Sequence, residues 1–353
     1  MTQMIRQSMT AYAAPLCETV VAVPQPRGSE VLVRISRCGV CHSDVHLQDG
    51  YFSLGGDKKL DVTAGRALPF TLGHEIAGVA EAAGPEAQVK LGQSFAVYPW
   101  IGCGTCAACR AGAENLCAAP RHLGVQVDGG FATHVLVPHP RYLIDHTGLS
   151  AALAGAYMCS GLTAYSTLKR ILEHARRGPA LLVGLGGVGM MGLAFARALF
   201  PHAPIVADID PAKREAALKA GAAAAYDPAD PNARKALVKA TGGVFGAVDF
   251  VGSDGSLAFA AGALAKGGKA VITGLLGGTY TTPIAMFPLR VFTLEGTMTG
   301  TLDEANEMMA LARAGKIPAV PIIERPLSAA QASLDDLRHG KVVGRVVLTP
   351  AAN

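Results

Sequence analysis

The chain has 353 residues, of which 50% are hydrophobic and 16% charged, and its formal net charge is +4. This length predicts two domains, and the composition supplies large buried cores and excludes a disordered chain. Lysine and arginine are scattered along the chain, without the basic stripe of a nucleic-acid-binding protein. No apolar stretch of signal-peptide length opens the chain, and the uncharged run 180–196 is too short and too rich in glycine to span a membrane. These features predict a cytoplasmic protein.

The first 160 residues are typical of a β-rich domain. Val31, Val33 and Ile35 alternate with polar residues, which is the pattern of a half-buried strand. Further apolar runs at 76–80 and 95–97 are separated by Gly and Pro, so they predict more short strands.

Two thiols and one imidazole are candidate metal ligands, in the motifs Gly39-Val40-Cys41-His42-Ser43-Asp44, Gly73-His74-Glu75 and Met158-Cys159-Ser160-Gly161. Each alone is a weak signal, because a single Cys is usually a small buried apolar side chain. Together, Cys41, His74 and Cys159 match the ligand set, with one open position, that is known for the catalytic zinc of alcohol dehydrogenases. Such an ion lowers the pKa of an alcohol or polarises a carbonyl group. Asp44 is a candidate to orient the His74 ring.

Four more cysteines crowd into a single short segment, as Cys103, Cys106, Cys109 and Cys117. In a chain without a secretion signal this crowding favours a metal over disulfides. Four thiolates fill a tetrahedral shell, so the segment predicts a structural zinc ion without an open position. Gly102 and Gly104 let the backbone fold tightly around it. The alternatives are four free buried cysteines or an iron–sulfur cluster, whose usual spacing differs from the gap before Cys117.

The middle of the chain alternates between apolar runs and Ala-rich helical stretches. The runs are 180–183, 205–207, 248–251 and 269–274. Strands that alternate with helices predict a parallel sheet with crossover helices.

The first of these runs leads into the glycine-rich sequence Gly184-Leu185-Gly186-Gly187-Val188-Gly189 and then into a helical pattern, which is the context of a dinucleotide-binding loop. Gly184 makes the turn, Gly186 lets a pyrophosphate approach, and Gly189 lets the helix pack on the strand. Asp208 follows about twenty residues later, where an acid binds the ribose 2′-hydroxyl and repels a 2′-phosphate. Ile209 follows it in place of an Arg, so the sequence predicts NAD over NADP. A plain packing turn is the alternative.

The last part of the chain predicts a helix at 303–314, with two acidic residues in its first turn and Gly315 after its end. Val342, Val343 and the run 346–348 predict a terminal strand.

With these motifs together, the sequence resembles the zinc-dependent alcohol dehydrogenases of the medium-chain dehydrogenase/reductase family, from Val31 to Leu348. The resemblance implies an α/β protein with a GroES-like, β-rich catalytic domain made of residues 1–160 and 299–353. A Rossmann domain with a doubly wound parallel sheet would occupy residues 161–298. It implies two zinc ions per chain, and hydride transfer between NAD and a primary or secondary alcohol, or an aldehyde or ketone in reverse.

The resemblance also implies roles for single residues. Cys41, His74 and Cys159 look like the catalytic zinc ligands, and Glu75 like a carboxylate that enters the zinc shell transiently. Ser43 and His46 look like a proton relay; a surface histidine is the alternative for His46. The implied cofactor contacts are the loop residues Gly184, Gly186, Gly187 and Gly189, His42 and Arg345 at the pyrophosphate, Asp208 and Lys213 at the adenosine ribose, and Thr163 and Val188 at the nicotinamide. The substrate-pocket candidates, for which ordinary core is the alternative, are Trp100, Ile101, Leu275 and Met298.

Two features depart from the family pattern. The segment Tyr51–Phe70 looks longer than in the simplest members, and its place between His46 and His74 predicts an effect on the pocket mouth. Gln93 stands where an Asp commonly occurs, and no catalytic consequence is expected.

Family members form dimers or tetramers, so a homodimer or homotetramer is expected, with Leu294–Met298 near a subunit contact. The alternatives from other classes are a polyol or amino-alcohol dehydrogenase of the same fold, a non-catalytic zinc- and nucleotide-binding protein, and a cysteine-cluster nucleic-acid binder.

Overall fold

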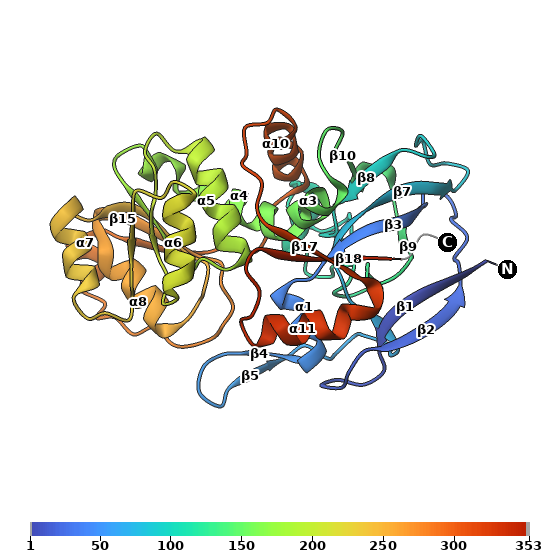
Figure 1. The fold of residues 1–353 in the computed structure, drawn as a ribbon, viewed down its shortest axis with the longest axis horizontal. Helices are drawn as coiled ribbons and strands as arrows, with labels where there is room; N and C mark the ends of the chain where they lie inside the picture. Colours follow the sequence, from blue (N-terminus) through green and yellow to red (C-terminus); the bar gives the residue numbers. More distant parts are fainter. Residues whose placement is uncertain (1, 351–353) are drawn as a thin grey trace.

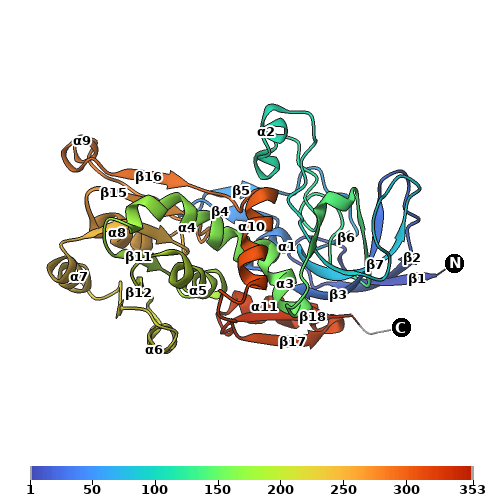
Figure 2. The same ribbon diagram turned by 90° about the horizontal axis from the view of Figure 1, so that it is seen from above.

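Two bodies lie side by side in the computed structural model, which describes residues 2–350 (Figure 1). One body contains both ends of the described chain and is built mainly from β-strands. The other contains the middle of the chain and is a sheet covered by helices (Figure 2).

The β-rich body contains one sheet with the strand order β2-β1-β6 and another with the order β10-β8-β7-β3-β18-β17, in which β9 also pairs with β3. Its strands are β1 (Gln3–Met9), β2 (Cys17–Ala22), β3 (Val31–Gly39), β6 (Phe70–Thr71), β7 (Glu75–Ala83), β8 (Ser94–Val97), β9 (His134–Val137), β10 (Leu143–Asp145), β17 (Ile322–Pro326) and β18 (Arg345–Thr349). Strand β18 pairs antiparallel with β3, so the two ends of the chain build one body.

Helices and a hairpin complete this body. The helical segments are α1 (His42–Asp49), α2 (Ala107–Arg110), η1 (Glu114–Leu116), η2 (Pro140–Tyr142), α3 (Ala151–Ala156), α10 (Leu302–Arg313), η4 (Leu327–Ala329) and α11 (Ala330–Arg338). A separate hairpin, β4 (Tyr51–Ser53) and β5 (Lys59–Asp61), lies in the segment that looked long in the sequence.

The second body is a six-stranded parallel sheet with the order β13-β12-β11-β14-β15-β16. Its first strand, β11, lies in the middle, and the chain winds outward in both directions, as in a Rossmann sheet. The strands are β11 (Ala180–Val183), β12 (Ile205–Ala207), β13 (Ala224–Tyr226), β14 (Val244–Asp249), β15 (Leu264–Ile272) and β16 (Thr293–Gly296). The helices are α4 (Leu162–Ala175), α5 (Gly187–Leu199), α6 (Pro211–Lys219), α7 (Ala233–Thr241), α8 (Asp254–Ala263) and α9 (Met286–Arg290).

Most expected elements are present, with shifted bounds. The run 248–251 belongs to a strand that begins earlier and ends at Asp249, because that carboxylate accepts hydrogen bonds from the next turn, at Val251 and Gly252. Val342 and Val343 are not in a strand, since β18 begins only after Gly344, whose φ of 87° breaks the extended chain. The run 180–196 forms β11 and α5, and no helix in residues 2–350 has the length and apolar character to cross a membrane.

The glycine loop after β11 gives a stability test. A Cβ atom at Gly189 would lie 1.8 Å from the carbonyl oxygen of Gly184, whereas at Gly186 it would meet nothing within 4 Å. We expect Gly189→Ala to lower the free energy of unfolding by about 3 kcal/mol or more, and Gly186→Ala to change it by less than about 0.5 kcal/mol. Chemical denaturation measures both; equal stability of the two variants would contradict the packing seen here.

Candidate functional site

The three candidate ligands of a catalytic metal come from distant parts of the chain. Cys41 stands directly before α1, His74 directly before β7, and Cys159 lies in the π-helical turn η3 (Tyr157–Gly161) between α3 and α4. All three are buried, and their ligand atoms lie within 4.8 Å of one another. The fold therefore brings the three motifs together at one point.

The donor set fits a zinc ion. The Sγ atoms of Cys41 and Cys159 are 3.9 Å apart, and two sulfur ligands at about 2.3 Å from a tetrahedral zinc ion are separated by about 3.8 Å. His74 Nε2 is buried and has no hydrogen-bond partner among residues 2–350, which leaves its lone pair for a metal. The pKa of the Cys41 thiol lies well below its usual range because the Cys159 thiol donates a hydrogen bond to it. A thiolate is the form that binds metal.

The carboxylate of Asp44 joins two of the ligand motifs. Its Oδ2 accepts a hydrogen bond from the Cys41 backbone N–H at 2.9 Å, and its Oδ1 accepts one from that of Gly73 at 3.2 Å. The same Oδ1 lies 3.2 Å from His74 Nδ1, an ion-pair distance, although the two groups are not aligned for a hydrogen bond. Asp44 thus occupies the orienting position expected for it, and Nε2 is left for the metal.

Glu75 and Arg345 form a buried ion pair beside the ligands. Arg345 Nη2 donates to both carboxylate oxygens of Glu75 at 2.6 Å, and to the Val40 carbonyl oxygen at 3.0 Å. The Ser160 hydroxyl donates to Glu75 Oε1 at 2.5 Å, and the Ser160 backbone N–H donates to the same oxygen at 3.3 Å. With Asp44, the centre buries two carboxylates and two thiols beside one guanidinium, and a divalent cation would compensate the charge of the thiols once both are deprotonated.

This geometry leaves the Nη1 atom of Arg345 for the contact expected at the pyrophosphate. Nη2 is committed to Glu75 and Val40, while Nη1 faces the glycine loop, because a Cβ atom at Gly187 would lie 2.8 Å from it. The side chain thus spans from the metal centre to the loop. Ser160 was missed in the sequence, where only its place next to Cys159 gave a signal.

The expected relay residues lie on α1. Ser43 Oγ is 3.8 Å from Cys41 Sγ, at the metal centre. His42 is exposed and its ring centroid is 5.4 Å from that of half-buried His46, which lies 4.8 Å from the Phe52 ring of the β4–β5 hairpin. Burial, and then the charge of His42, lower the pKa of His46 below its usual value.

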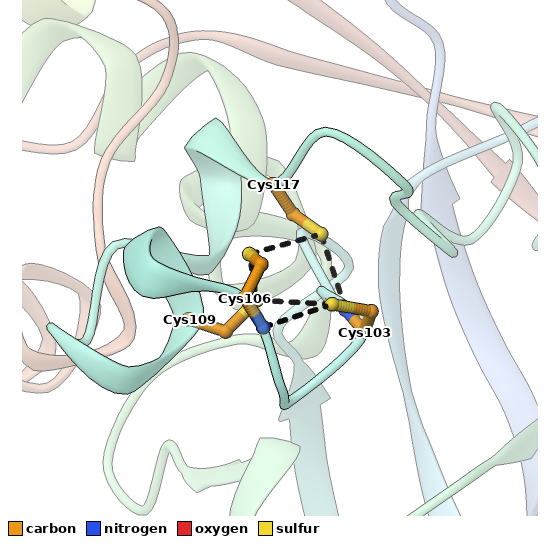
Figure 3. A group of neighbouring side chains, drawn as sticks. All are labelled: Cys103, Cys106, Cys109 and Cys117. Atoms are coloured by element: carbon orange, nitrogen blue, oxygen red, sulfur yellow. Dashed lines mark hydrogen bonds between the residues drawn. The ribbon is translucent and has the colours of Figure 1, made fainter.

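The second cysteine group forms a closed cluster in the lobe around α2 (Figure 3). The Sγ atom of Cys106 lies 3.5 Å from that of Cys109 and 3.8 Å from that of Cys117. The Sγ atoms of Cys103 and Cys109 are 4.0 Å apart. These separations are again those of a tetrahedral zinc site. A Cβ atom at Gly102 would lie 2.4 Å from Cys109 Sγ, so a glycine is required there.

The dinucleotide motif lies at the carboxyl end of β11. The backbone turns at Gly184, whose φ is 90°, and Gly187 begins α5. The Asp208 carboxylate follows β12 and accepts a hydrogen bond from the Leu185 N–H at 2.6 Å, which places an acid beside the loop. Lys213 on α6 is half-buried, with Nζ 4.0 Å from Asp210 Oδ2.

The remaining expected contacts divide into buried and exposed groups. Thr163 on α4 is buried and Val188 on α5 is half-buried. Trp100 and Ile101 are buried, and the Trp100 ring centroid is 5.4 Å from that of His74. The last two pocket candidates are largely exposed in this chain, namely Leu275 at 54% and Met298 at 46%.

The chain is similar to known proteins. Residues 27–146 match the family described as "Alcohol dehydrogenase GroES-like domain", and residues 187–314 that described as "Zinc-binding dehydrogenase". An NAD-dependent alcohol dehydrogenase of Sulfurisphaera tokodaii is 36% identical over 342 residues, which cover 95% of this chain and 97% of that protein.

Solved structures extend the likeness. An alcohol dehydrogenase of Aeropyrum pernix gives a TM-score of 0.87 at 29% identity, over 98% of this chain and 100% of that one. The D-arabinose dehydrogenase of Sulfolobus solfataricus gives a TM-score of 0.85 at 26% identity, over 99% of this chain and 100% of that one.

Metal analysis tests the two ligand sets. We expect about two zinc ions per native chain, and about one in Cys106→Ser and in Cys159→Ser, because each variant breaks a different set. Cys17→Ser is the matched control, since Cys17 is exposed and belongs to neither set. The Cys106 variant should also unfold at a lower temperature. Retention of both ions in either variant would contradict the assigned ligands.

Proposed function

The chain belongs to the zinc-binding alcohol dehydrogenases with a GroES-like domain, and from this premise we propose how its residues carry out the reaction. It is an oxidoreductase that transfers a hydride between an alcohol and NAD. One observation supports the site most directly. Arg345 reaches from Glu75, beside the three metal ligands, to Gly187 of the dinucleotide loop, so the two halves of the chemistry lie next to each other.

The protein residues bind and orient the metal, the cofactor and the alcohol, and they move the proton of the alcohol hydroxyl. Cys41, His74 and Cys159 would hold a zinc ion, which would supply a Lewis acid for the alcohol oxygen, and bound NAD would supply the hydride acceptor. Ser43 Oγ, beside Cys41, takes the proton of the alcohol hydroxyl. Buried groups around this point exclude water, which strengthens the electrostatic interactions there.

Ser43 gives up its own hydroxyl proton as it accepts that of the alcohol, and His46, on the same helix α1, takes up the released proton and passes it to solvent. Its depressed pKa keeps the imidazole neutral near neutral pH, as an acceptor must be. Among the neighbouring charged groups, His42 and Arg338 lower the pKa of His46, whereas Asp49 and Cys41 raise it.

The same premise gives proposals for the cofactor. The loop of Gly184, Gly186, Gly187 and Gly189 receives the pyrophosphate at the start of α5, where the helix end carries partial positive charge. Asp208 receives the adenosine ribose and excludes a 2′-phosphate, with Lys213 nearby. His42 and Arg345 Nη1 contribute at the pyrophosphate, and Thr163 and Val188 at the nicotinamide.

We also propose a cytoplasmic homo-oligomer with the domain division 1–160, 161–298 and 299–353. Reduced cysteines in two zinc sites suit a reducing compartment. Strand β16 ends the parallel sheet as an edge strand, and Ile284, Leu289 and Val291 beside it are exposed apolar residues, which supports a subunit contact through that edge.

The activity is tested with NAD and a panel of primary, secondary and aromatic alcohols, followed by NADH absorbance. We expect NADH formation that a zinc chelator removes and added zinc restores. NADH formation that survives loss of the ion from the Cys41–His74–Cys159 site would contradict the proposed role of that site.

The pH profile tests the relay. We expect kcat for alcohol oxidation to fall as the pH drops through the lowered pKa of His46, because the protonated ring accepts no further proton. His46→Gln should lose that inflection and lower kcat by roughly tenfold or more at neutral pH. An unchanged profile in this variant would exclude His46 from the relay.

Gly186 tests the cofactor site without disturbing the fold. We expect Gly186→Ala to raise the KM for NAD by about tenfold or more, because its methyl group stands where the pyrophosphate approaches. The alcohol KM and the unfolding temperature should remain near those of the native chain. An unchanged KM for NAD would show that the cofactor does not approach this residue.

A further inference from the structure

One histidine that the relay does not use lies close to the metal centre. The Arg121 N–H donates to the Ile101 carbonyl oxygen at 2.8 Å, and the Leu123 N–H to that of Pro99 at 3.1 Å. This antiparallel pairing sets His122 opposite residue 100, with both side chains on one face.

The neighbour on that face is Trp100, whose ring packs against His122 and against the metal ligand His74. The Trp100 and His122 rings meet edge to face at a centroid distance of 5.3 Å. The Trp100 ring centroid also lies 5.4 Å from that of His74, and its Nε1 donates to the carbonyl oxygen of Met158 at 2.9 Å.

The His122 ring has a buried nitrogen without a partner. Its side chain is 4% exposed, and Nε2 makes no hydrogen bond to any group in residues 2–350. Burial lowers the pKa of His122 to about 4, so the ring is neutral at neutral pH. A neutral imidazole carries one donor and one acceptor nitrogen, and a hydroxyl group satisfies Nε2 in either state.

A second buried polar atom without a hydrogen-bond partner in the described chain is Asn115 Oδ1, seven residues before His122. Asn115 is 2% exposed, and its Nδ2 donates to the Met298 carbonyl oxygen at 2.8 Å, while Oδ1 has no partner in the described chain. Thr299, next to Met298, has a φ of 49° and a buried hydroxyl that also has no partner there. Unpartnered buried polar groups and strained backbone are both uncommon, and both concentrate at functional sites.

We propose that the physiological substrate is a diol or polyol, and that a hydroxyl other than the reacting one binds His122 Nε2. The proposal rests on the alcohol dehydrogenase activity above and names its substrate class. A monohydric, purely apolar alcohol would leave His122 Nε2 buried and unpaired, which a site of this kind discriminates against strongly.

The test compares 1-butanol with 1,2-, 1,3- and 1,4-butanediol on the zinc-loaded enzyme with NAD. The four share one carbon chain and differ only in the second hydroxyl and its position. We expect kcat/KM for at least one diol to exceed that for butanol by about tenfold or more. 1-Amino-2-propanol, compared with 1,2-propanediol, separates a hydroxyl from an ammonium group; a preference for the amine would overturn the proposal.

Variants of His122 assign the effect to one atom. His122→Phe keeps a ring against Trp100 but removes Nε2, so kcat/KM for the preferred diol should fall about 10- to 100-fold while that for butanol stays within about threefold. His122→Gln places an amide near the position of Nε2 and should restore most of the diol preference. His202→Phe, at an exposed histidine, is the control for loss of a histidine elsewhere.

Binding gives a readout that does not depend on turnover. In the complex with NADH the alcohol cannot be oxidised, so titration of NADH fluorescence reports diol affinity alone. We expect the Phe variant to bind the preferred diol about tenfold or more weakly and butanol unchanged.

The outcomes separate the two proposals. Oxidation of butanol without preference for any diol, or equal losses on both substrates in His122→Phe, would overturn the substrate class and leave the alcohol dehydrogenase activity intact. Failure to oxidise any member of either panel would overturn the activity and, with it, this inference. If the Phe variant does not fold, the native-chain comparison and the Gln variant still decide.

Discussion

The buried ion pair between Arg345 and Glu75 is the interaction on which the rest of the site depends. Arg345 opens the C-terminal strand β18, whereas Glu75 opens β7 and directly follows the ligand His74. The pair therefore ties the returning end of the chain to the metal centre, and through Gly187 to the dinucleotide loop. Removing one partner would leave an uncompensated charge in the interior, which is far more costly than losing a surface pair. The connection between the two bodies thus has the character of a buried core contact.

The sequence predicted the features that lie within one short segment, but not the contacts that folding makes between distant segments. The cysteine cluster, the glycine loop and the helix expected at 303–314 are each predicted from spacing within one segment, and the structure contains all three, with the helix at 302–313. Cys41, His74 and Cys159 were proposed as ligands from their donor set and from the family resemblance, and the fold brings them together. Ser160 could not be assigned in that way, because its partner Glu75 lies 85 positions away and no pattern links the two.

The same limit applies to the pocket. Trp100 was a pocket candidate, and it packs against the His74 ligand, but its neighbour His122 gave no signal in the sequence because a lone histidine has no characteristic spacing. Exposure of Leu275 and Met298 likewise depends on which loops lie beside them, which residue type does not encode. The division of the chain into domains stays a prediction.

The long segment 51–70 gains a physical role from its contacts. A Cβ atom at Gly55 would lie 2.8 Å from Gly278 Cα, and one at Gly277 would lie 2.6 Å from the Ser53 carbonyl oxygen. The hairpin therefore packs backbone to backbone against the loop after β15, while Phe52 contacts His46 on its other side. Neither Gly55 nor Gly277 leaves room for a side chain at this contact. A change of the angle between the two bodies must consequently move the hairpin, and with it the surroundings of His46.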